Sequence, residues 1–368
     1  MKKVKGGVTA PKGFQAAGIA CGLKKSGKPD LSLIVSAVPA VAAGVFTTNQ
    51  VKGNPVIVSQ DHLKNGLAQA IISNAGNANT WTGKQGLRAA YEMAELAAKV
   101  LGFQPNDVLV TSTGVIAKPL KMNKIRAGIK QIAGKLSTTG SGAAARAIMT
   151  TDTRPKEIAV KVGNITIGGI AKGSGMIEPG MCTMHAFITT DAVIDKRLLK
   201  KILQNAVNKS FNLVSVDNCM STSDCVFVLA NGQSKSKPGK SFIKAFEFVC
   251  EYLAKEIARD GEGATKLMTV KVAGARSEAD ANKVVKSIIG NFLLKAAVYG
   301  RDKNVGRILQ AVGATSAKVN WQRFKFDWKI GSKEDIINVK LGVGQALAKG
   351  WGCDLTEGYV KINAKYRT

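Results

Sequence analysis

Histidine is nearly absent from this 368-residue sequence, which contains only His62 and His185. A serine or threonine hydroxyl is a weak nucleophile until a base removes its proton, and histidine is the usual base. Neither histidine lies in a G-x-S-x-G segment, so a conventional Ser-His-Asp triad is not indicated. The six cysteines form no CxxC pair and show no metal-like spacing. We therefore expect no metal site and no resident cofactor.

Acidic and aromatic residues are also scarce. The chain has 25 Asp and Glu against 53 Lys and Arg, a net charge of +28, and only 6% aromatic residues. The lysines are spread along the chain without a basic run of five or six, and few aromatics are available to stack on bases. We interpret the charge as a solvated surface that attracts anionic substrates. A nucleic-acid-binding protein is the alternative, and it would bind in a strongly salt-dependent manner.

Long apolar stretches are missing as well. No window of 18 residues is apolar and uncharged, and the Met1-Lys2-Lys3 start is not followed by a signal-peptide core. We therefore expect a cytoplasmic protein with no membrane span and with reduced, mostly buried cysteines. The hydrophobic content of 45% allows a sizeable core, and the length favours two domains or one large domain.

Alternating apolar runs and glycine turns predict a mixed α/β protein. Strands are predicted at 31–37, 41–49, 54–60, 68–76, 107–117, 184–192, 225–232 and 267–275. A hairpin is predicted within 157–177, turning at Gly163-Asn164. Helices are predicted at 83–102, 121–136, 195–211 with Asp195 as cap, 241–261, and within 277–300. Strands and helices alternate in clusters without clean βαβ units, which favours an α/β layered sandwich.

The segment 172–192, KGSGMIEPGMCTMHAFITTDA, suggests a catalytic nucleophile. A loop rich in glycine and proline ends at Cys182-Thr183, and a strand-like run follows at once. An N-terminal threonine carries its own base, because its α-amino group has a reference pKa of about 7.7–8.0. That chemistry needs the Cys182–Thr183 bond to break, by attack of the threonine hydroxyl on the peptide carbonyl. From the residues alone, a structural threonine between a loop and a strand remains the alternative.

This segment resembles the signature of the bifunctional glutamate N-acetyltransferase / ornithine acetyltransferase family of arginine biosynthesis, K-G-S-G-M-I-x-P-x-M-A-T-M. Further family-like blocks occur in family order: GVTAPKGFQAAGI (7–19), AGVFTTNQV (43–51), SNAGNAN (73–79), TSTGVIA (111–117), TTDTRPK (150–156), GEGATK (261–266) and GRDKNVGRIL (300–309). The resemblance therefore covers nearly the whole chain. Departures are Cys182 in place of alanine, the residues Asn218, Cys219 and Met220, and Lys303-Asn304-Val305 in place of Pro-Asn-Trp. They bear on cleavage rate and substrate detail.

The resemblance implies a role for each of several residues. It makes Thr183 the nucleophile, both in self-cleavage after Cys182 and in accepting the acetyl group. It assigns Thr113 and Gly114 to the oxyanion hole, where preplaced donors stabilise developing negative charge. Alone, a Thr-Gly turn after a strand would be structural.

The same resemblance implies a set of substrate-binding residues: Thr151, Lys172, Thr183, Glu262, Asn363 and Thr368. A lysine can hold the α-carboxylate of an amino acid, and a carboxylate such as Glu262 can hold its amino group. The alternatives are a solvated loop lysine, a loop acid at a helix end and a frayed terminus. Either threonine of the Thr150-Thr151 pair could be the contact. His185 could face the site, although a packed strand histidine is expected.

The resemblance also implies the fold and the reaction. The expected fold is an α/β layered sandwich like those of N-terminal-nucleophile enzymes, with a second smaller α/β domain. The chain would form an α fragment, 1–182, and a β fragment, 183–368, which co-fold and associate as a heterotetramer of two of each. Acetyl would pass from N-acetylornithine to Thr183 and then to glutamate, with acetyl-CoA left open as a second donor. The alternative enzyme is a self-cleaving N-terminal-threonine aminopeptidase or amidase, with water as acceptor.

Overall fold

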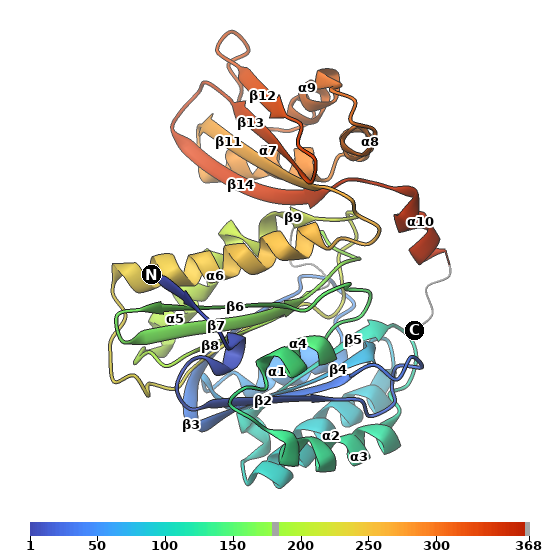
Figure 1. Cartoon of the computed structure of the whole chain (residues 1–368), viewed down its shortest axis with the longest axis vertical. Coiled ribbons are helices and arrows are strands. Elements are labelled where there is room, and N and C mark those ends of the chain that lie inside the picture. The colour runs from blue at the N-terminus through green and yellow to red at the C-terminus, as the bar shows by residue number, and fades with distance from the viewer. Residues whose placement is uncertain (179–183, 365–368) are drawn as a thin grey trace.

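The computed structural model describes residues 1–178 and 184–364 of the chain, and within them two β-sheets form (Figure 1). The larger sheet has nine strands: β1 (Lys2–Val4), β2 (Phe14–Ile19), β3 (Leu31–Phe46), β4 (Leu67–Asn77), β5 (Val108–Val115), β6 (Lys156–Val162), β7 (Ile165–Lys172), β8 (His185–Thr190) and β10 (Cys225–Ala230). The smaller sheet has five: β9 (Val214–Ser215), β11 (Leu267–Ala275), β12 (Lys325–Lys329), β13 (Glu334–Lys340) and β14 (Ala346–Cys353).

The larger sheet is folded into two facing halves. Its strand order is β1-β6-β7-β8-β10-β3-β4-β5, with β2 paired to β3, whose register with β4 shifts between Val35 and Ala40. One buried apolar cluster joins Phe187 of β8 and Phe227 of β10 to Leu109 of β5. Side chains from both halves therefore form a common inner core.

Helices cover the outer faces of the two halves. The apolar face of α6 (Lys240–Arg259) packs on β6 and β7, and that of α5 (Lys196–Lys209) packs on β3 and on α6, all within one buried cluster. The helices α2 (Gly83–Leu101) and α3 (Met122–Ile132) pack on the half that contains β4 and β5. The short helix α1 (Asn54–His62) packs on β5. The helix α4 (Ser141–Ala147) instead packs on β2 and contributes to the inner core. The layered α/β sandwich expected from the sequence is confirmed.

A second, smaller α/β unit follows in the chain, as expected. Its sheet, in the order β12-β13-β11-β14-β9, is covered by α7 (Glu278–Ile289), with α8 (Phe292–Gly300) and α9 (Val305–Gly313) beside it (Figure 1). After β14 the chain forms α10 (Glu357–Asn363), which leads back toward the larger unit. The remaining short 3-10 helices are η1 (Gly7–Thr9), η2 (Pro105–Asp107), η3 (Ala133–Lys135) and η4 (Phe211–Leu213). No helix within the described ranges combines the length and apolarity needed to cross a bilayer.

Two strand predictions were wrong in detail. The segment 54–60 was expected as a strand because it is apolar, but it forms helix α1. Pro55 stands in the first helical turn, where its missing N–H costs nothing, and Ser59 donates to the Val110 carbonyl of β5. The strands expected at 31–37 and 41–49 are one bent strand, β3. A bulged strand carries a continuous apolar run around a bend.

Elsewhere, turn and cap residues in the sequence predicted the local structure correctly. The predicted hairpin joins β6 to β7 with Gly163 at a φ of +55°, which favours glycine at this turn. Asp195 caps α5 by accepting the Leu198 N–H at 2.9 Å. Of the cysteines in the described part, Cys225, Cys250 and Cys353 are buried thiols, Cys21 is half-buried and Cys219 is exposed. The expectation of buried cysteines therefore fails for Cys219.

We predict that Asp195→Ala lowers the free energy of unfolding by about 1 kcal/mol, because the first turn of α5 loses its side-chain acceptor. Urea denaturation measures this difference, with Lys200→Ala as a control on an exposed face of the same helix. Equal stabilities of the two variants would contradict the capping role.

Candidate active site

Six residues singled out in the sequence line one cleft, although they are spread over 250 positions of chain. The cleft has a volume of about 80 Å³. The six residues are Thr113, Gly114, Thr151, Lys172, Glu262 and Asn363. They come from the end of β5, the loop before β6, the end of β7, the loop after α6 and the end of α10. The fold therefore brings together every predicted site residue that it describes.

Three of the predicted side chains meet at the Glu262 carboxylate. The Thr151 hydroxyl donates to Oε1 at 2.6 Å, and the Asn363 amide donates to Oε2 at 2.7 Å. The carboxylate is only 8% exposed. At Gly175 a Cβ atom would lie 2.2 Å from Oε2, so a larger residue there would displace the carboxylate. Because the Thr151 hydroxyl makes this contact, Thr151 rather than Thr150 is the threonine bound to the carboxylate.

Lys172 places an amino group in the same cleft. It is the last residue of β7 and is 1% exposed. Burial lowers the pKa of its ammonium, an effect that the Asp152 carboxylate opposes and the Lys156 cation reinforces. A buried cation close to the Glu262 carboxylate gives the cleft one group of each charge. An amino acid, which carries both a carboxylate and an ammonium, matches this arrangement.

The Thr113-Gly114 turn ends β5 where it runs beside β4. Thr113 pairs with Ala75, and Gly114 pairs with Gly76. Gly114 has a φ of +130°, and a Cβ atom there would approach the Gly76 carbonyl carbon to 2.4 Å. Only glycine fits this conformation and close approach. The turn is thus rigid, as a preorganised oxyanion hole requires.

The loop at 174–177 is held by a carboxylate that we did not single out from the sequence. Asp217 accepts the N–H groups of Met176 at 2.6 Å and Ile177 at 2.8 Å, and the Tyr359 hydroxyl donates to it at 3.3 Å. Burial raises the pKa of Asp217 in spite of these N–H donors. This contact ties the loop to α10, which carries Asn363. In the sequence, only the polar composition of the segment 216–224 pointed to Asp217.

The start of β8 is held by hydrogen bonds to residues 223–225. Asp224 Oδ1 accepts the Met184 N–H at 2.8 Å, and the Cys225 N–H donates to the Met184 carbonyl at 3.2 Å. His185 is buried, and its Nε2 donates to the Ser223 carbonyl at 3.1 Å. Burial, with the Lys172 cation, lowers the pKa of His185 to about 3. It is thus a neutral, packed strand histidine, as expected, and it does not line the cleft.

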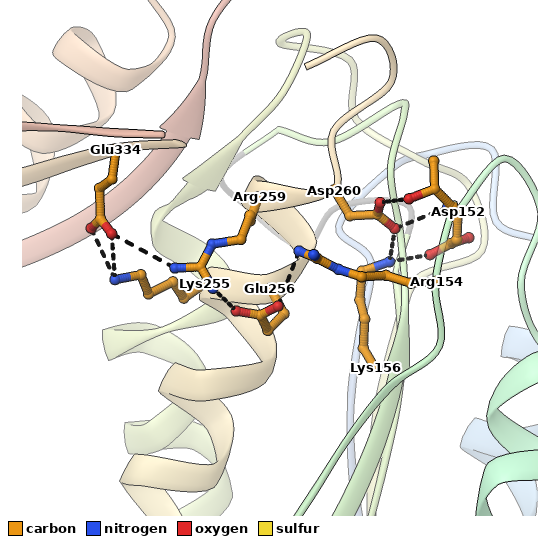
Figure 2. A network of polar contacts seen from close by, with 9 residues as sticks. Asp152, Arg154, Lys156, Lys255, Glu256, Arg259, Asp260 and Glu334 are labelled. Atoms are coloured by element: carbon orange, nitrogen blue, oxygen red, sulfur yellow. Dashed lines mark hydrogen bonds and ion pairs between the residues drawn. The ribbon is translucent and has the colours of Figure 1, made fainter. Parts of the chain in front are cut away.

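Lys156, Asp152 and Asp260 form a buried ion cluster (Figure 2). Its Asp152 and Lys156 charges act on Lys172. Lys156 Nζ is 2.6 Å from both Asp152 Oδ1 and Asp260 Oδ2, and Asp152 also accepts the Gly173 N–H at 2.7 Å. Burial alone would raise the pKa of Asp152, but Lys156, Lys172 and the Gly173 N–H together hold it well below its usual value. This cluster fixes the backbone that carries Lys172.

A second set of ion pairs continues from α6 to the smaller sheet (Figure 2). Arg154 pairs with Glu256 at 3.1 Å, and Lys255 pairs with Glu334 of β13 at 2.9 Å. Arg259 contacts both Glu256 and Glu334. The loop before β6 is thereby linked through α6 to the smaller unit. These outer pairs are partly exposed, so each contributes little to stability.

A larger cavity, of about 840 Å³, lies between the smaller sheet and helices α5 and α6. Lys271, Asn338 and Lys349 are among its lining residues, and none of the predicted site residues is. In residues 1–178 and 184–364, no group of three or more His, Cys, Asp or Glu side chains is arranged to bind a metal ion. The predicted residues Cys182, Thr183 and Thr368 lie outside the described residues.

The fold and cleft define an α/β sandwich enzyme whose site carries a buried lysine and a buried glutamate. The ArgJ family model matches residues 15–332 and 327–368. The arginine biosynthesis bifunctional protein ArgJ of Symbiobacterium thermophilum is 46% identical over 402 aligned residues, covering 100% of each chain. The chain therefore belongs to the ArgJ family, and it is an acyltransferase of arginine biosynthesis.

Two solved structures are similar to parts of this chain. The ornithine acetyltransferase of Mycobacterium tuberculosis, complexed with ornithine, is 40% identical and covers 50% of this chain and 98% of its own, with a TM-score of 0.48. The l-aminopeptidase d-ala-esterase/amidase of Ochrobactrum anthropi, described as a variant of the ntn hydrolase fold, is 13% identical. It covers 70% of this chain and 86% of its own, with a TM-score of 0.39.

We predict that Lys156→Met lowers the free energy of unfolding by about 3–5 kcal/mol, because it leaves two buried carboxylates without their cation. Lys255→Met is the control: its ion pair is partly exposed (31% and 28% for the two side chains), and its loss should cost about 1 kcal/mol or less. Urea denaturation of both variants measures the difference. Equal losses would contradict the role assigned to the buried cluster.

The depressed pKa of Asp152 gives this cluster a pH signature. A carboxylate with a lowered folded-state pKa contributes stability that is complete above its unfolded value, about 3.9, and is lost as the pH falls toward the folded value. Wild type should therefore lose this contribution below about pH 4. In Lys156→Met the acid-side loss should be smaller, because one cation that lowers the pKa is gone.

Proposed function

We propose that the chain cleaves itself between Cys182 and Thr183 and then transfers acetyl from N-acetylornithine to glutamate through an acetyl ester of Thr183. The observation that carries the proposal is the convergence of six predicted residues on one cleft. It is supported by the position of Met184, the residue after Thr183, which is anchored beside cleft-lining Ser221, Thr222 and Ser223. Family membership supports the same reaction.

The proposed cleavage creates the base that the reaction needs. The Thr183 hydroxyl attacks the Cys182 carbonyl carbon, the C–N bond breaks, and the acyl group moves to the threonine oxygen as an ester. Water hydrolyses this ester, leaving a carboxylate on Cys182 and a free α-amine on Thr183. The amine can then remove the hydroxyl proton near neutral pH.

Acetyl transfer follows in two half-reactions. The Thr183 oxygen attacks the acetyl carbon of N-acetylornithine, and Thr113 with the Gly114 turn stabilises the oxyanion. The α-amine passes the proton to the departing ornithine nitrogen. The amine of glutamate then attacks the ester carbon, which gives N-acetylglutamate and restores the hydroxyl. Splitting the transfer in this way replaces one difficult step with two easier ones.

The cleft residues have complementary tasks in this scheme. Lys172 would bind a substrate carboxylate, and Glu262, with Thr151 and Asn363, would bind a substrate ammonium. Thr368 is proposed to close the site from the C-terminus. Acetyl-CoA is an open second donor, and its use would add synthesis of acetylglutamate to the recycling reaction. A cytoplasmic location fits a biosynthetic enzyme of this kind.

The strand order supports co-folding of the two proposed fragments, 1–182 and 183–368. In the larger sheet, β8 and β10 lie between β7 and β3. These two strands of the second fragment pair with each other, and the pair is hydrogen-bonded to the first fragment on both sides, β8 to β7 and β10 to β3. Separation would expose four strand edges and the inner core. We propose that the fragments stay together as one catalytic unit and that two such units form a heterotetramer.

We predict that Thr183→Ala gives one uncut chain without acetyl transfer, because both steps lose their nucleophile. Intact mass and an assay with N-acetylornithine and glutamate measure this. Cys182→Ala is the matched control and should still be cut and active, since a small residue is kept before the nucleophile. Wild type that remains uncut and inactive would refute the proposal. Acetate release that glutamate does not affect would instead identify an amidase.

Glu262→Gln should raise the KM for the amino-acid substrates roughly 10- to 100-fold, the value of one charge-assisted hydrogen bond of about 1.5–3 kcal/mol. The amide keeps the shape of the carboxylate but loses its charge. Steady-state kinetics checks this, with Glu247→Gln, an α6 residue paired with Lys209 at the surface, as control. An unchanged KM would exclude Glu262 from ammonium binding.

A further inference from the structure

The cavity of about 840 Å³ lies on one face of the smaller sheet. The other face of this sheet is apolar and packs on α7, where Val270 and Val272 of β11 and Val339 of β13 belong to the same buried cluster as that helix. Side chains alternate along a strand, so the residues between these point toward the cavity. The volume of the cavity is within the range of pockets that hold small molecules.

Four lysines occupy the cavity face of four neighbouring strands. They form two pairs in which the lysines are directly opposite each other. Lys325 of β12 is opposite Lys340 of β13, and Lys271 of β11 is opposite Lys349 of β14. All four line the cavity. The sheet order is β12-β13-β11-β14, and adjacent strands are about 4.8 Å apart, so the lysines span roughly 14 Å across the sheet.

Like charges that are directly opposite in a sheet destabilise it, because the Cβ atoms of cross-strand neighbours are only about 5 Å apart. Lys349 is compensated by an ion pair with Glu251 and by the Trp351 ring, whose centroid is 5.3 Å from Nζ. Among the described residues, no carboxylate lies within 4 Å of the amino groups of the other three lysines. An anionic ligand in the cavity would offset their repulsion.

The carboxylates of the lining do not cancel its positive charge. Five lysines line the cavity, the fifth being Lys209 of α5, against three carboxylates. Glu251 is engaged by Lys349, and Asp327 accepts the Asn338 amide at 3.5 Å. The third carboxylate is Glu278, at the start of α7. The cavity therefore keeps a positive balance.

The rest of the lining favours an organic anion over a bare ion. Asn205 and Asn208 of α5 supply amide groups on the side opposite the sheet. Leu347 of β14 is 68% exposed and supplies an apolar surface beside the lysines. Because helices α5 and α6 bound the cavity opposite the sheet, the space fits a small molecule better than a strand of nucleic acid.

We propose that this cavity binds a nucleoside diphosphate, with its phosphates on Lys271, Lys325 and Lys340 and its nucleoside against Leu347. Phosphate oxygens carry charge at neutral pH, and the lysine ammonium is a common phosphate ligand. None of the residues assigned to acetyl transfer lines this cavity. The nucleotide site is thus separate from the catalytic cleft and does not require self-cleavage.

Calorimetric titration of the protein with ADP tests the site. We expect saturable binding of one ADP per chain, weakened roughly 10- to 100-fold in Lys271→Gln and in Lys340→Gln, because each loses a charge-assisted hydrogen bond. Lys329→Gln is the matched control, since Lys329 is an exposed lysine of β12 opposite Ile336 and outside the cavity lining. Its affinity should equal that of wild type. Equal weakening in all three variants would show attraction by net charge alone and overturn the assignment.

Thermal melting separates a ligand-binding lysine from a structural one. Without ADP, Lys340→Gln should melt at or above the wild-type temperature, because its repulsion with Lys325 is gone. Saturating ADP should raise the melting temperature of wild type and of Lys329→Gln, but not that of Lys340→Gln. A lower melting temperature of Lys340→Gln with an unchanged ADP shift would make Lys340 structural and contradict the site.

A third measurement uses wild type alone and locates the ligand. Reductive methylation followed by mass spectrometry compares lysine labelling with and without ADP. We expect ADP to protect Lys271, Lys325 and Lys340 and to leave Lys329 unprotected. Equal labelling of these lysines in both samples would overturn the proposal. So would displacement of ADP by N-acetylornithine, which would place it in the catalytic cleft, or tighter binding of a single-stranded oligonucleotide, which would identify a nucleic-acid surface.

Discussion

The insertion of β8 and β10 between β7 and β3 is the constraint on which the site depends. These two strands pair in parallel, so their starting ends lie at the same edge of the sheet. Met184 and the segment 221–224 therefore meet where β7 ends at Lys172. On the facing half, β4 and β5 are also parallel, and β5 ends there with Thr113 and Gly114. One cleft thus collects the ends of strands from both halves.

Burial of charge is the second requirement of this arrangement. The cleft places a lysine and a glutamate in positions that are at most 8% exposed, where unpaired charges are costly. The protein meets this cost with fixed partners: Thr151 and Asn363 for Glu262, and Asp152 of the buried ion cluster for Lys172. The same contacts fix the geometry, because a side chain held by two partners has little freedom. Preorganised charge of this kind is what acyl transfer requires.

Much of the fold followed from local patterns in the sequence. The cap at Asp195, the glycine turn at Gly163 and the apolar faces of α2 and α6 each act within a few residues. Helix α1 was missed because Val56 and Val58 suggest a strand, whereas Pro55 and packing on β5 decide for a helix. The bend in β3 depends on pairing with β4 and β10, which is a long-range property.

The cleft could be predicted only through family resemblance. Nothing local connects Thr113 to Asn363, since their places in one cleft depend on the path of the whole chain. Asp217 and Asp224 were not singled out, because their partners are backbone N–H groups, which any sequence supplies. Only the polar composition of the segment 216–224 pointed to these two residues. The cavity of about 840 Å³ is larger, yet the chemistry converges on the small cleft.

We propose that a threonine made N-terminal by the chain itself carries the acetyl group. The most direct measurement is the intact mass of wild-type protein after mixing with N-acetylornithine in the absence of glutamate. We expect two fragments, with a single acetyl group on the one that begins at Thr183, and loss of that group when glutamate is added. An acetyl group on any other residue, or transfer by a chain that remains uncut, would contradict it.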